Sequence, residues 1–241
     1  MPKKIFIVSI LLLFMAILSL PFLNKDLGQL KAKQLSPRER TGEEITYEVK
    51  LGNMSLGEAK FRYSGKVNLE GKTLNLMVLE TKVFNFSDTE NIYTDLKDFL
   101  PVRIERDITS FLKKERIIED YDQKNYLVTI TKINSRKPKK SIIRSKGVIH
   151  NAILFPYAVR DLSDLKVGQI FAVNLPSRNL QVKLVSIENL KLAKGTFEAF
   201  HFESTPKQIA VWISTDERRI PLKIEGAGIF SYSLVLKDYH P

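Results

Sequence analysis

The sequence predicts a mostly β protein, with about a dozen antiparallel strands in a strongly curved sheet or in a barrel-like or sandwich arrangement. Apolar and polar residues alternate with a period of two through most of the chain from Ile45 onward. Residues that favour turns, such as Gly57, Gly65, Gly71 and Asp88, separate the alternating segments. The regular helical stretches that a parallel βαβ fold requires are missing from the pattern.

The chain begins with a predicted export segment. Two lysines precede an apolar run over 5–23, and basic residues before such a run are typical of signal sequences. About 20 apolar residues span a membrane, so 1–23 is either a cleaved signal peptide or an anchor that 5–23 forms in the inner membrane. Residues 24–41 are polar and predict a tether, which leaves 42–241 as a single β domain.

The first strand is predicted over 45–51, where Ile45, Tyr47 and Val49 face one side and the residues between them face the other. The same alternation predicts strands over 59–63, 74–78, 92–96, 102–108, 116–120, 126–130, 170–175, 180–187, 197–202, 209–214, 222–224 and 229–236. The chain has 14 Phe and 8 Tyr. These large side chains either fill the concave side of a curved sheet or line a groove for an acyl chain.

One segment departs from the period of two. Between 151 and 165, apolar residues fall at helical spacing around Pro156, which predicts a short helix or two turns that plug or cover the sheet. A basic stretch precedes this segment and predicts an exposed hairpin loop or sheet edge, which either contacts an anionic envelope component or is only solvated. Its basic residues are Arg136, Lys137, Lys139, Lys140, Arg144 and Lys146.

A hairpin predicted over 211–224 offers a candidate ligand site. In one interpretation Asp216 accepts hydrogen bonds from turn amides and pairs with Arg218 or Arg219, which fixes the turn without any ligand. In the other, Trp212 and Arg218 or Arg219 mark the mouth of a cavity. An aromatic face and a guanidinium group there would hold an acidic head group.

Several short motifs together resemble those of an exported bacterial family known as domain of unknown function 3108. They are Gly42 and Glu43 before a strand that contains Tyr47, the Gly-Glu-Ala step at 57–59, Leu100 with Pro101, and the run from Trp212 to Pro221. The family's Asp-Leu-Ser segment is shifted here to 161–163, after Phe155, Pro156 and Tyr157. The resemblance covers 42–238 and implies an envelope location and a mostly antiparallel β fold. It implies no activity and no catalytic residues.

The residue types exclude several kinds of chemistry. The chain has no cysteine, which excludes disulfide scaffolds, thiolate zinc sites, iron–sulfur clusters and thiol nucleophiles. The three histidines, His150, His201 and His240, lack the spacing of metal ligands, and no nucleophile or phosphate-loop motif is present. We therefore expect no metal and no cofactor. Carboxylate groups such as those of Glu119 and Asp120 would permit a hydrolase. Their availability is its sole support, so a carboxylate hydrolase is the least favoured function.

The charge and the export segment together indicate the kind of partner. The formal net charge is +11, but export and the placement of aromatic residues in strands argue against nucleic acid. We expect a noncatalytic periplasmic protein that binds or carries an amphipathic, lipid-like envelope molecule, with basic residues contacting its anionic part. The alternative is a structural protein that docks envelope assembly partners through its sheet edges and basic loop.

Overall fold

The computed structural model describes residues 40–111, 113–133, 137–226 and 232–241. The first eight strands are β1 (Glu44–Leu51), β2 (Met54–Leu69), β3 (Lys72–Val83), β4 (Phe86–Thr94), β5 (Pro101–Ser110), β6 (Lys113–Asp122), β7 (Leu127–Ile133) and β8 (Lys139–Arg144). The helical turns α2 (Phe155–Ala158) and η1 (Val159–Asp161) follow. The last six strands are β9 (Ile170–Leu175), β10 (Arg178–Leu192), β11 (Gly195–Thr205), β12 (Ile209–Ser214), β13 (Pro221–Gly226) and β14 (Tyr232–His240).

These strands form one antiparallel sheet in the order β8-β7-β6-β5-β4-β3-β2-β1-β14-β13-β12-β11-β10-β9. Each half is therefore a meander of strands that are neighbours in sequence. The first and last strands pair in the middle of the sheet, where Glu44 is opposite His240. The mostly β, antiparallel class is confirmed, and the sheet is open, with β8 and β9 as its edges.

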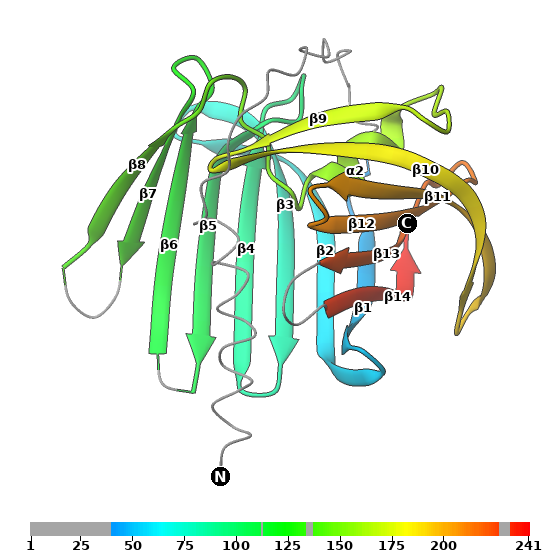
Figure 1. Ribbon diagram of the computed structural model, residues 1–241. Coiled ribbons are helices and arrows are strands. Elements are labelled where there is room, and N and C mark those ends of the chain that lie inside the picture. The colour runs from blue at the N-terminus through cyan, green and yellow to red at the C-terminus, as the bar shows by residue number, and fades with distance from the viewer. Residues whose placement is uncertain (1–39, 112, 134–136, 227–231) are drawn as a thin grey trace.

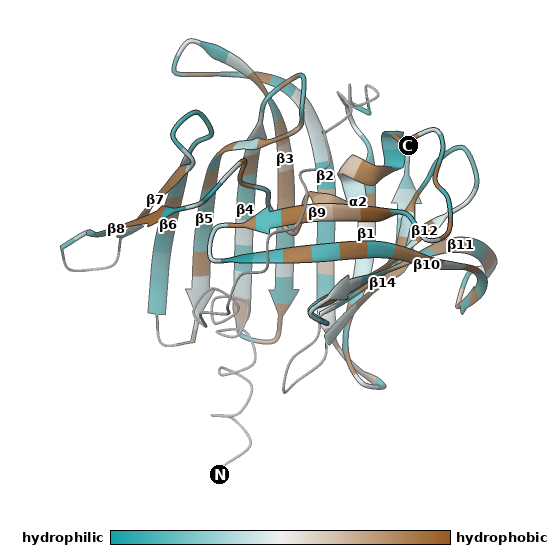
Figure 2. Cartoon of the chain, turned by 45° about the horizontal axis from the view of Figure 1, so that its top comes forward, coloured by the Kyte–Doolittle hydropathy of each residue, from teal (hydrophilic) through white to brown (hydrophobic). Residues whose placement is uncertain are grey.

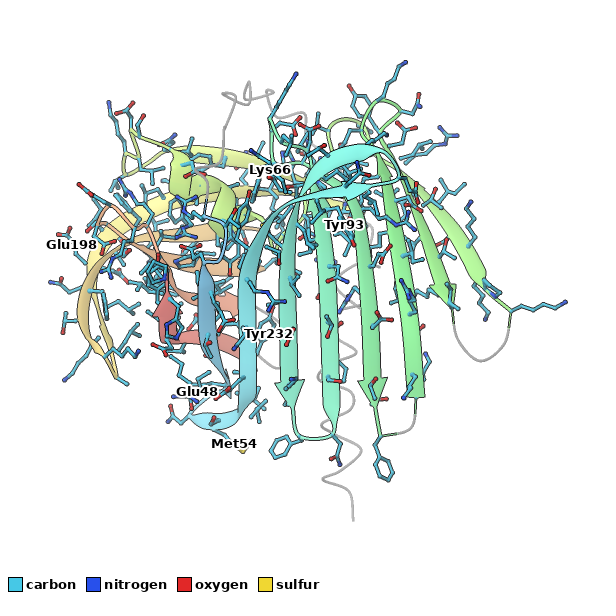
Figure 3. All side chains as sticks on the ribbon, turned by 180° about the vertical axis from the view of Figure 1, so that it is seen from behind. Glu48, Met54, Lys66, Tyr93, Glu198 and Tyr232 are labelled. Carbon is cyan, nitrogen blue, oxygen red and sulfur yellow. The ribbon has the colours of Figure 1, made fainter. Side chains whose placement is uncertain are left out.

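Strands β2–β8 form a curved wall, and β9–β12 lie crosswise in front of it (Figure 1). We call the side of the wall that is turned toward α2 the inner face. It includes Phe61, Met77, Ile92 and Ile104, which pack in one buried cluster with Tyr157 and with Ile45 of β1. The outer face carries the alternating residues and is turned to the reader in Figure 3, where Tyr93 lies on this side.

The predicted helical segment covers the inner face but is shorter than 151–165. Pro156 stands in the first turn of α2, where a missing N–H group costs no hydrogen bond, and the chain becomes extended at Leu162. The Tyr157 ring stacks on Phe61 with centroids 3.6 Å apart, and its hydroxyl lies 3.3 Å from that of Tyr47. In Figure 2, α2 and much of β9 are apolar where they cross the wall.

A second buried cluster lies between the helical turns and the crosswise strands. Phe155 of α2 packs edge-on against Phe202 of β11, with centroids 5.9 Å apart. Val159 of η1 belongs to the same cluster, as do Val211 and Ile213 of β12. This part of the molecule is a filled core, so most of the Phe side chains of the second half have a packing role.

Three residues that were expected to mark turns lie inside strands instead. Gly57 and Gly65 are within β2, and Asp88 is within β4. Gly65 has a φ of +84° and stands where the register with β3 shifts, so it forms a bulge rather than a turn. Asp88 is paired with β3 on one side and with β5 on the other, and Arg106 donates a hydrogen bond to its buried carboxylate.

Gly57 is required by the close approach of β3. A Cβ atom at this position would lie 2.1 Å from the carbonyl oxygen of Lys82 and 3.0 Å from Cα of Val83. We expect Gly57→Ala to lower the free energy of unfolding by about 1–3 kcal/mol, because two strands must separate to admit the methyl group. Urea unfolding measures this. Gly147→Ala is the control, since its nearest atom is 3.9 Å away, and equal midpoints for the two variants would contradict the prediction.

The predicted export segment, 1–23, lies outside the described residues, and so does the predicted tether except for Arg40 and Thr41. From Arg40 onward, in the parts of the chain that the structure describes, no helix is long and apolar enough to cross a membrane.

Candidate functional site

Two carboxylates are buried on the inner face of β4. Asp88 and Glu90 alternate in phase with Ile92 and Thr94, and all four are buried. Asp88 is 6% exposed and Glu90 is 5% exposed. Ionised groups at such depth need partners of opposite charge or hydrogen-bond donors. Because the rest of this face is rich in apolar residues, these two carboxylates make the region a candidate functional site.

Arg106 of β5 is the cation between these carboxylates. It lies opposite Glu90 in the register of β4 and β5. Its Nη2 donates a hydrogen bond to Oδ2 of Asp88 and lies 3.4 Å from Oε1 of Glu90. Glu119 of β6 is a third carboxylate near Glu90, and it accepts a hydrogen bond of 2.7 Å from the hydroxyl of Tyr121. We call Asp88, Glu90, Arg106 and Glu119 the inner charged cluster.

Burial shifts the titration of this cluster. Burial raises the pKa of Glu90 to about 7, and although Arg106 opposes the shift, the charges of Asp88 and Glu119 add to it. Burial also raises the pKa of Tyr232 in β14, with a further contribution from Glu90. The start of β14 therefore lies within electrostatic range of the cluster. Near neutral pH the carboxyl group of Glu90 is therefore close to the midpoint of its titration.

The inner face opens toward the edge strand β8. Glu90, Arg106, Ile117, Lys132 and Lys139 are neighbours in register across five strands from β4 to β8. Ile117 is 2% exposed, whereas Lys132 is half-buried and Lys139 is exposed. Adjacent strands are about 4.8 Å apart. This row therefore runs for about 19 Å from an acidic, buried end to a basic, exposed end.

The predicted basic stretch forms the edge of the sheet, where the sequence analysis expected a hairpin loop or an edge. Lys139, Lys140 and Arg144 belong to β8, with Lys137 before it and Lys146 after it, and all five are exposed. Arg136 lies outside the described residues. Alternation along β8 places Lys139 on the inner face and the other two strand residues on the outer face.

Trp212 lies on the face of β12 opposite that of Val211 and Ile213. Its ring stacks on His201 with centroids 4.2 Å apart, and Lys223 lies 4.7 Å from the ring centroid. Its Nε1 donates a hydrogen bond of 2.7 Å to Glu188. Trp212 is 7% exposed and is covered by these neighbours.

Arg218 and Arg219 lie in the turn after β12, and the structure does not bring either into contact with Trp212. Arg218 donates through Nε and Nη2 to Oδ2 of Asp216, at 2.9 and 2.6 Å. Oδ1 of Asp216 accepts from the hydroxyl of Ser214 at 2.7 Å. These are contacts of the kind expected for a turn that is fixed without a ligand. Arg219 differs, because its guanidinium lies 4.4 Å from the centroid of the Phe200 ring.

A pocket of about 270 Å³ lies beside this turn. Its lining includes Arg218 but neither Trp212 nor Arg219; the residues are Arg40, Thr41, Glu43, Glu217, Arg218, Tyr239 and Pro241. At its base, Glu43 accepts two hydrogen bonds of 2.6 Å from Arg160 of η1 and one of 3.0 Å from the hydroxyl of Tyr239. This buried pair fastens the helical segment to the start of β1.

Sequence reasoning missed the inner charged cluster as a site. A signal was present, because Asp88 and Glu90 fall at the same parity as Ile92 in a strand with a period of two. A carboxylate at a buried parity position indicates either an ion pair or a ligand contact. Arg106 was inside the predicted strand 102–108, and Glu119 was noted only as one of several acidic residues.

Comparisons with known proteins give a family and two distant folds. No curated protein matches the sequence. One similar structure is a β-barrel-like protein of domain of unknown function DUF1849 from Brucella abortus, with a TM-score of 0.48, 8% identity and coverage of 83% of this chain and 97% of that one. Another, from Bacteroides fragilis, has a YmcC-like fold and is proposed to be exported; its TM-score is 0.30, with 9% identity and coverage of 86% and 100%. The model of the family "Protein of unknown function (DUF3108)" matches residues 46–232, so the chain belongs to that family.

Proposed function

We propose that the protein is a noncatalytic protein of the cell envelope that binds an amphipathic, lipid-like molecule on the inner face of its open sheet. The mixed composition of that face between β4 and β8 carries the proposal. Ile104 and Ile117 share it with Glu90, Arg106 and Lys132. Ionised groups lose hydration when they are buried, a cost that a purely apolar core avoids. A ligand with an apolar chain and a polar head complements both kinds of side chain.

The envelope location rests on the predicted export segment. A cleaved signal peptide and an inner-membrane anchor over 5–23 would both place the β domain on the periplasmic side. There the exposed basic residues of the β8 edge, Lys139 and Lys140 among them, would meet anionic head groups. The positive formal charge of the chain favours such contacts.

The geometry of the carboxylates favours binding over hydrolysis. A carboxylate hydrolase holds its substrate bond between an acid and a base. Here the space between Asp88 and Glu90 holds Arg106, whose Nη2 contacts both of them. A permanent cation in that position keeps the carboxylates paired and supports a recognition role.

Native mass spectrometry tests the proposal on the full chain purified from the envelope fraction of expressing cells. We expect one copurifying amphipathic molecule per chain, identified after organic extraction. Ile108→Asp places a charge on the half-buried apolar part of the inner face and should abolish copurification. Two controls should retain the molecule: Ile142→Asp on the outer face of β8, where Ile142 is 60% exposed, and Trp212→Phe. An apo mass, together with no binding of dodecyl-chain amphiphiles of any head group, would overturn the proposal.

A second candidate function has its own observation. Among the described strands, β8 pairs with β7 alone, and its outer face exposes Ile142 together with Lys140 and Arg144. An extended segment of another protein can add to such an edge. Lysines on an edge also protect a sheet against unwanted pairing. A docking protein would lose its partner in Ile142→Asp and keep it in Ile108→Asp, which is the reverse of the result expected for ligand binding.

A further inference from the structure

We propose that the inner charged cluster recognises a primary ammonium group on the head of the amphipathic ligand. The inference rests on the proposed function, because the apolar part of the ligand must lie on the same face. It specifies the chemistry of the head group, which the proposed function leaves undefined. Three features of the cluster favour a cation: it has a net negative charge, one of its carboxylate oxygens has no hydrogen bond, and isoleucine side chains lie beside it.

The cluster carries more negative than positive charge. It has three carboxylates, from Asp88, Glu90 and Glu119, and one guanidinium, from Arg106, and these four groups interact electrostatically. The chain as a whole has a formal charge of +11. The cluster therefore has the opposite sign to the rest of the molecule. Asp88 and Glu90 share the guanidinium group of Arg106. A second cation beside them would therefore form favourable ion pairs with both carboxylates.

One oxygen of this cluster is unsatisfied. Oδ2 of Asp88 accepts from Arg106, but Oδ1 is buried and has no hydrogen-bond partner within the described parts of the chain. It is the one carboxylate oxygen in that condition among those residues. A buried acceptor without a donor costs about 1–3 kcal/mol. An ammonium group has three N–H donors and no acceptor, so it satisfies this oxygen and can also contact Glu90.

The unsatisfied donors in the same region do not point to an anion. Nε of Arg106 has no hydrogen-bond partner in the described part of the molecule, but this is equally true of Nε of Arg160. Arg160 is held by two hydrogen bonds to Glu43 in a purely structural pair. A buried Nε without a hydrogen bond therefore also occurs in a pair that needs no ligand, whereas Asp88 has the one carboxylate oxygen in this condition among the described residues.

The surroundings of the cluster suit the chain of an amphiphile. Ile108 is opposite Asp88 on β5, and Ile117 is opposite Arg106 on β6. Ile108 and Glu119 are half-buried, whereas Asp88 and Glu90 are buried. Ile117 is 2% exposed, and the inner face becomes exposed at Lys139 of the edge strand β8. We infer that the ammonium group lies at the buried β4 end and that the alkyl chain runs along the inner face toward the open edge.

Isothermal titration with dodecyl-chain probes tests the inference on the full chain. The probes are n-dodecylamine, dodecanoate and dodecyl maltoside, each below its critical micelle concentration at pH 8, where the amine is protonated. We expect dodecylamine to bind about tenfold tighter than dodecanoate or more. Asp88→Asn and Glu90→Gln should each weaken dodecylamine binding about tenfold and leave dodecyl maltoside binding unchanged. The control is Asp107→Asn, on the outer face of β5, where the Asp107 side chain is 58% exposed, and it should change neither.

The outcomes separate this inference from the proposed function. Equal affinity for all three probes, or a preference for dodecanoate, would overturn the ammonium site and leave a lipid-binding face in place. Failure of all three probes to bind would overturn both proposals. Loss of dodecyl maltoside binding in Asp88→Asn and Glu90→Gln would show that the cluster supports the shape of the inner face and does not read the head group.

Discussion

Arg160→Met is expected to lower the free energy of unfolding by about 3–5 kcal/mol, because it leaves the Glu43 carboxylate buried without its cation. Glu43 is 4% exposed and Arg160 is also 4% exposed. Two hydrogen bonds of 2.6 Å join them, and Nη2 of Arg160 also donates to the carbonyl oxygen of Arg218 at 2.9 Å. The helical segment, the start of β1 and the turn after β12 therefore share one guanidinium. Urea unfolding at pH 7 measures the loss.

A double variant and a neighbouring pair make this test specific. Glu43→Gln with Arg160→Met leaves no buried charge, so it should lose less stability than the two single variants together. Glu44→Gln is the control, because Glu44 pairs at 2.7 Å with Lys60 in a partly exposed position, and it should leave the midpoint nearly unchanged. A wild-type midpoint for Arg160→Met would show that the pair does not hold the helical segment.

Glu90→Gln is expected to stabilise the protein above pH 7, by on the order of 2–3 kcal/mol. The pKa of Glu90 is about 7 in the folded protein, against an ordinary value of 4.5. The folded state therefore holds a proton that the unfolded state releases. The stabilisation is fully present below pH 4.5 and is lost as the pH rises through 7. Glutamine resembles the protonated acid at all pH values, so it removes this loss.

The groups that face Glu90 determine how large this effect is. Asp88 and Glu119 oppose its ionisation, Arg106 favours it, and Tyr232 approaches it from β14. The measurement is the free energy of unfolding of the unliganded protein at several values between pH 5 and pH 8, for the wild type and the variant. Glu80→Gln, on the outer face of the adjacent strand β3, is the control and should follow the wild type. Parallel curves for wild type and Glu90→Gln would contradict the prediction.

Alternation predicted most of the sheet because most strands have one face that is more buried than the other. The predicted limits of 170–175 and 209–214 coincide with β9 and β12, where turn residues bound the pattern. The edge strand β8 was harder to predict as a strand, since five of its six residues are exposed. An alternating pattern arises when one face of a strand is buried, and an edge strand such as β8 has few buried residues.

The candidate site was less predictable for two physical reasons. The alternation placed Trp212 opposite Val211 and Ile213, but nothing in a period of two says which face of a strand is the inner one. The buried pair of Glu43 and Arg160 joins residues that are 117 positions apart. Sequence spacing cannot predict such contacts, because the topology of the sheet brings the partners together.

The central pairing of β1 with β14 has a consequence for the order in which the molecule is completed. The two meanders consist of hairpins whose partners are close in sequence, so each can assemble as the chain becomes available. The ladder between them joins β1 to β14, with Glu44 opposite His240, and cannot begin until β14 is available. In a chain that crosses a membrane from its N-terminus, the two meanders would stay unpaired until β14 has crossed. The wall of β2–β8 would therefore be complete before the ladder of β1 and β14 joins the second meander to it.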